Sequence, residues 1–63
     1  MDPEKTFTEF RLAISEDRKL DAARHARTLE EWIAKGGYRP AGAPGDFECW
    51  IAAWSALLDT ETV

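Results

Sequence analysis

The sequence predicts a small all-α protein, a bundle of three helices forming one domain over residues 1–63. Good helix formers (Ala, Leu, Glu, Arg and Lys) dominate the chain, and β-branched residues are few. Apolar residues recur every three or four positions and do not alternate, which favours helices over strands. All four glycines and two of the three prolines lie between Lys35 and Trp50, so the rest of the chain beyond Pro3 is free of helix breakers.

The first helix is expected at about residues 6–15. Thr6 and Glu9 have the spacing of a capping box, in which the hydroxyl and the carboxylate each satisfy a free backbone amide. Thr8 is the other candidate for the start. At about 100° per residue the apolar positions fall on one side of the helix. This stripe consists of Phe7, Phe10 and Ile14, with Ala13 beside it.

The second helix is expected at about residues 18–35. Gly36 suits the residue just past its end, because glycine adopts the left-handed conformation easily. On the outer side, Glu31 has the i,i+4 spacing of an ion pair with both Arg27 and Lys35. The apolar stripe of this helix consists of Ala22, Ala26, Leu29 and Ile33, and the polar side of Arg24, Arg27, Glu31 and Lys35.

Two interpretations of residues 6–35 stay open, because no glycine or proline separates the two stripes. The stripes differ in direction by roughly 100°, so a single straight helix would face two ways. Ser15 and Asp17 are candidate N-caps for a new helix. A turn at about residues 15–19 is therefore one interpretation, and one continuous helix is the other.

The third helix is expected at about residues 46–59, with Asp46 as its N-cap. Its main apolar stripe consists of Phe47, Ile51, Trp54 and Leu58, widened by Trp50 and Leu57. The opposite side carries small residues, and only Glu48 and Ser55 are polar between Phe47 and Leu58. Because two short helices can cover only one side of such a helix, we expect the other side to bind a partner. The candidate interface residues are Cys49, Ala52, Ala53, Ala56, Trp50, Trp32 and Tyr38.

The segment "GGYRPAGAPG", residues 36–45, is expected to be an ordered connector and not a ligand site. It lacks both common phosphate-binding glycine patterns, and the helix after it opens with Asp46 and Glu48, which repel an anion. No small-molecule ligand is expected. Within this loop, Tyr38 and Arg39 are candidate contacts for a protein partner.

Few residues are candidates for a catalytic or metal-binding role. His25 lies four residues after Asp21, which could orient an imidazole, and Cys49 lies in the first turn of a helix, where a thiol can be activated. One cysteine and one histidine do not make a structural zinc site. No nucleophile–base pair, metal site or cofactor motif emerges, so we expect no enzyme, no catalytic residue, no metal and no cofactor.

The net charge of −4 lies in the last third of the chain, since residues 40–63 hold four acids and no base. This excess argues against direct contact with nucleic acid or an anionic membrane. No apolar run is long enough to span a bilayer, and the polar start is not typical of a secretory signal, so a cytoplasmic protein is expected. The four acids, Asp46, Glu48, Asp59 and Glu61, are a candidate surface for a basic partner.

Between Phe10 and Trp32, the spacing F..AI, A..HA and L..W resembles the helical hairpins of tetratricopeptide-like repeats. It covers less than half of the chain and lacks the Leu-Gly and Tyr positions of that family, so the resemblance implies a hairpin and assigns no residue roles. The sequence therefore predicts a non-catalytic protein–protein interaction module that self-associates through its third helix. The alternative is a small acidic regulator of a basic or nucleic-acid-binding protein.

Overall fold

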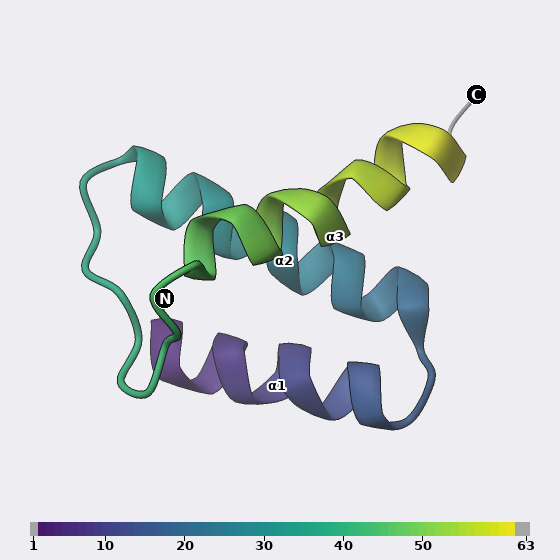
Figure 1. Ribbon diagram of the computed structural model, residues 1–63, viewed down its shortest axis with the longest axis horizontal. Coiled ribbons are helices and arrows are strands. Elements are labelled where there is room, and N and C mark those ends of the chain that lie inside the picture. Colours follow the sequence, from purple (N-terminus) through teal and green to yellow (C-terminus); the bar gives the residue numbers. More distant parts are fainter. Residues whose placement is uncertain (1, 62–63) are drawn as a thin grey trace.

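The computed structural model describes residues 2–61, except for the side chain of Glu61. Three helices make up this part, α1 (Pro3–Ser15), α2 (Lys19–Ala34) and α3 (Phe47–Glu61), and it contains no strand. Helices α1 and α2 form a hairpin, and the loop after α2 returns the chain so that α3 packs against α2 (Figure 1). The predicted all-α, three-helix class is confirmed.

Helix α1 begins at Pro3, ahead of the expected start near residue 6, because Asp2 is its N-cap. The Asp2 carboxylate accepts hydrogen bonds from the backbone N–H of Glu4 (3.1 Å) and of Lys5 (3.3 Å). Pro3 occupies the first turn, where its missing N–H costs nothing. The predicted capping box at Thr6 is therefore wrong, and the Thr6 hydroxyl instead donates to the backbone carbonyl of Asp2 (3.1 Å).

A turn at residues 16–18 separates α1 from α2, so two helices and not one span this region. Asp17 does not cap α2 as predicted; it ends α1, with a left-handed φ of 59°. Its N–H donates to Ile14 O (3.1 Å), and that of Arg18 donates to Ala13 O (2.8 Å). This pair of hydrogen bonds is the Schellman motif. Ser15 is not the N-cap of α2 either, since its hydroxyl donates to Leu12 O (2.9 Å).

Asp17→Gly is expected to stabilise the fold by about 0.5–1 kcal/mol, because the left-handed conformation strains a residue with a Cβ and does not strain glycine. Urea denaturation followed by circular dichroism measures the change. Asp17→Ala is the matched control and should destabilise, since alanine lacks the tolerance of aspartate for this conformation. Equal stability of the two variants would show that the backbone at this turn is unstrained.

Helix α2 also ends in a Schellman motif, here with glycine, the residue most often found in its left-handed position. Gly36 has a φ of 92°, its N–H donates to Ile33 O (3.0 Å), and the next N–H, of Gly37, donates to Trp32 O (2.9 Å). The prediction that Gly36 ends this helix is confirmed. In the loop that follows, Pro40 is buried and Ala43 packs against the core, so the connector is tied to the body of the domain.

Helix α2 is the middle element and makes close backbone contacts with both other helices. Its buried residues are small on the side of these contacts, namely Ala22, Ala23 and Ala26. Helices α1 and α3 face one another across aromatic rings. Phe10 packs against Trp50 (ring centroids 5.0 Å apart) and Trp54 (6.1 Å), and Phe7 packs against Phe47 (5.4 Å). The predicted stripes of α1 and α2 thus face the core.

One link between α2 and α3 differs from the sequence-based expectation. Arg27 was predicted on the outer face of α2, paired with Glu31. Instead its Nε donates to the hydroxyl of Ser55 (2.7 Å), and its Nη2 donates to the Ser55 carbonyl (3.1 Å) and to the Asp59 carboxylate (3.0 Å). These bonds satisfy the hydroxyl of a residue that is almost fully buried, which makes Arg27 a clamp between the two helices.

Candidate interaction surface

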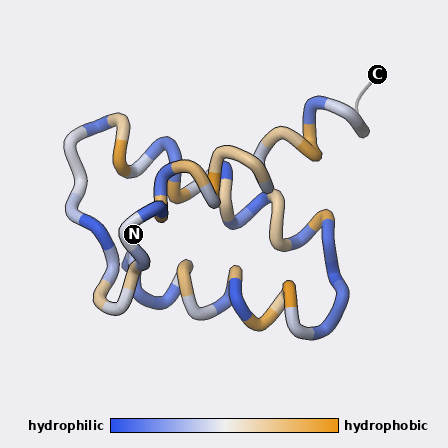
Figure 2. The backbone as a smooth tube through the Cα atoms, viewed as in Figure 1, coloured by the Kyte–Doolittle hydropathy of each residue, from blue (hydrophilic) through white to orange (hydrophobic). Residues whose placement is uncertain are grey.

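The outer face of α3, the side turned away from α1 and α2, is apolar and uncovered. We define it by six exposed residues: Cys49, Ala52, Ala53, Ala56, Leu57 and Thr60. Figure 2 shows that hydrophilic positions are nearly absent from the middle of α3, whereas they recur along α1 and α2. The four small residues predicted at this face therefore lie together on it, and none of the six carries a charge.

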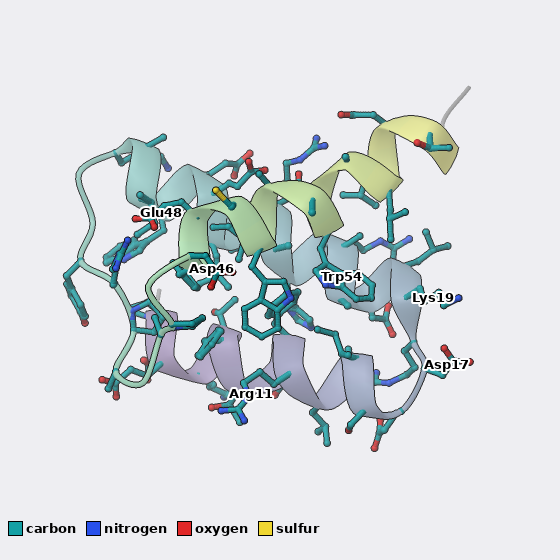
Figure 3. The ribbon with its side chains drawn as sticks, viewed as in Figure 1. Arg11, Asp17, Lys19, Asp46, Glu48 and Trp54 are labelled. Atoms are coloured by element: carbon teal, nitrogen blue, oxygen red, sulfur yellow. The ribbon has the colours of Figure 1, made fainter. Side chains whose placement is uncertain are left out.

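One flank of the outer face carries Leu57 and adjoins two tryptophans. Leu57, predicted to widen the core stripe, is 36% exposed, because its position on the helix is too far round to reach α1. With Ala53 and Trp54 it lines an open notch of about 150 Å³. Trp50 and Trp54 adjoin this flank and are half-buried, and the ring of Trp54 extends from α3 toward α1 (Figure 3). Leu57 and Thr60 are the two exposed members of this surface that sequence reasoning missed.

The opposite flank of the outer face carries Glu48 and Asp59, and both are paired within the chain. Glu48, labelled in Figure 3, lies in the first turn of α3. It accepts hydrogen bonds from Nε of Arg39 (2.9 Å) and from its Nη2, a two-point contact between loop and helix. Asp59 pairs with Arg27 (3.0 Å). Arg39, predicted as a candidate partner contact, is thus engaged by its own chain.

The hydrogen bonds from Arg39 lower the pKa of Glu48 below its ordinary value of 4.5, and a backbone hydrogen bond and the charge of Arg39 act in the same direction. Because the pKa is lowered on folding, this pair stabilises the fold above pH 4.5. The contribution is lost as the pH falls through the lowered pKa.

An NMR titration of the side-chain carboxyl carbons is expected to show Glu48 titrating below 4.5, since protonation must break the contact with Arg39. Arg39→Gln should raise this pKa toward 4.5. Arg24→Gln is the control, because Arg24 pairs with Asp21 (3.7 Å) and not with Glu48. An unchanged Glu48 titration in Arg39→Gln would contradict the assigned cause.

Trp32 and Tyr38, also predicted as interface residues, form a separate aromatic corner at the end of α2. The Trp32 indole N–H donates to the backbone carbonyl of Tyr38 (2.9 Å), and the two rings meet edge to face at 5.7 Å. Tyr38 is 64% exposed. The ring contacts among the described residues join Trp50 to Phe7 and Phe10 and do not join it to this corner.

The candidate chemical groups are Asp21, His25 and Cys49. Asp21, expected to orient His25, pairs with Arg18 (3.1 Å) and Arg24. Cys49 is a free, exposed thiol in the first turn of α3. Within residues 2–61, no three side chains of the His, Cys, Asp and Glu types form a group that could hold a metal ion.

Comparisons with protein-family models, with curated proteins and with solved structures each found no match. The resemblance to tetratricopeptide-like hairpins therefore rests on residue spacing alone. None of the helices in the described part of the chain is long and apolar enough to cross a membrane.

Proposed function

We propose that this chain is a protein–protein interaction module that associates with a second copy of itself through the outer face of α3. One observation carries the proposal. A helix with an apolar core side also has an uncharged, exposed outer side, where surface helices normally carry polar and charged residues. Burial of that side removes the exposed Leu57 and the adjoining tryptophan edges from water, which favours association.

A second copy is the partner that the outer face fits. The small side chains of Ala53 and Ala56 let a second helix approach closely if its own side chains at the contact are also small. The outer face of α3 in a second copy has such side chains. The absence of charge on the face means that two copies do not repel there. Glu48 and Asp59, at one edge of the face, are balanced by Arg39 and Arg27 of the same chain.

The expected association is weak. A standard interface takes roughly 800 Å² from each partner, whereas the whole surface of this chain is 4110 Å². One face of a 15-residue helix, roughly 22 Å long at 1.5 Å per residue, supplies less than that. We therefore expect a weak dimer that dissociates on dilution.

Light scattering over a hundredfold dilution is expected to show a dimer at high concentration and a monomer at low concentration. Ala53→Glu should leave a folded monomer at every concentration, because dimerisation would bury its carboxylate without a partner. The matched control is Thr28→Glu, which adds the same charge at an exposed position of α2 and should keep the dimer. A native chain that stays monomeric throughout would refute self-association.

The alternative, an acidic regulator of a basic protein, has less support. Of the four acids it relies on, Glu48 and Asp59 are already held by Arg39 and Arg27. A basic partner would have to compete with these arginines. Capture of a basic protein by the monomeric Ala53→Glu variant, lost when Asp46 is changed to Lys, would favour this alternative over the dimer.

A further inference from the structure

We draw no further inference here: the strongest candidate, the surface patch that the aromatic corner of Trp32 and Tyr38 forms at the end of α2, carries nothing because nothing in the structure shows what covers it.

Discussion

Phe10→Ala is expected to cost about 3–5 kcal/mol of stability, the usual cost of emptying a large aromatic site in a core. The Phe10 side chain has no exposed surface and contacts the rings of Phe7, Trp50 and Trp54. It is the aromatic ring through which α1 reaches both tryptophans of α3. Its loss leaves a cavity that α2 cannot close, because the alanines of α2 already lie at close approach.

This cost is comparable to the whole stability of a domain of this length, roughly 3–9 kcal/mol at 0.05–0.15 kcal/mol per residue. Urea denaturation followed by far-ultraviolet circular dichroism is expected to show a Phe10→Ala chain that is largely unfolded before urea is added. Leu12→Ala is the control on the same helix, since Leu12 is 46% exposed, and it should change stability by less than about 0.5 kcal/mol. Similar losses in both variants would contradict the assignment of the core to the space between α1 and α3.

Periodicity identifies the three helices because burial repeats with the helical turn. Phe7 and Phe10 in α1, and Ala26 and Leu29 in α2, are apolar at the spacing that one buried side requires, and all four are buried. The end of α2 at Gly36 is equally predictable from the sequence, because the left-handed residue after a helix is usually glycine. Asp17 fills the same role at the end of α1, and its residue type alone favours an N-cap.

Long-range side-chain contacts are the part that periodicity does not reveal. Arg27 reaches Ser55, and Arg39 reaches Glu48, only because the loop after α2 returns the chain so that α3 packs against α2. On the sequence alone, Arg27 has nearer candidate partners on its own helix. The Arg27 clamp also explains how Ser55 is buried on an otherwise apolar side of α3.

The candidate surface was partly predictable. The small residues from Cys49 to Ala56 already indicate a side of α3 without charge, and the structure leaves that side exposed. Leu57 lies at the edge of the apolar stripe, so the sequence alone does not predict whether α1 covers its side chain or leaves it exposed. The neutralisation of Glu48 and Asp59, which weighs against an acidic binding surface, required the fold.

Gly37→Ala is expected to cost about 2–4 kcal/mol, although alanine is normally a mild replacement for glycine. A Cβ at Gly37 would lie 2.4 Å from the Trp32 ring, closer than van der Waals contact permits. Relief of this overlap must move the indole, which breaks its hydrogen bond to the Tyr38 carbonyl. Overpacking costs about 1–3 kcal/mol and the lost hydrogen bond about 0.5–1.5 kcal/mol. Thermal and urea unfolding, followed by tryptophan fluorescence, measure the loss.

Two further variants separate this overlap from the general effect of adding a methyl group to a loop. Gly45→Ala has no atom within 4 Å of the new Cβ and no left-handed φ, so it should be neutral or slightly stabilising. In a Trp32→Leu background, Gly37→Ala should lose most of its cost, because the ring that it strikes is gone. An equal cost in both backgrounds would place the strain in the backbone of the loop. Loss of the cost would instead show that Gly37 is required by the indole of Trp32, which lies over it and holds the loop against the end of α2.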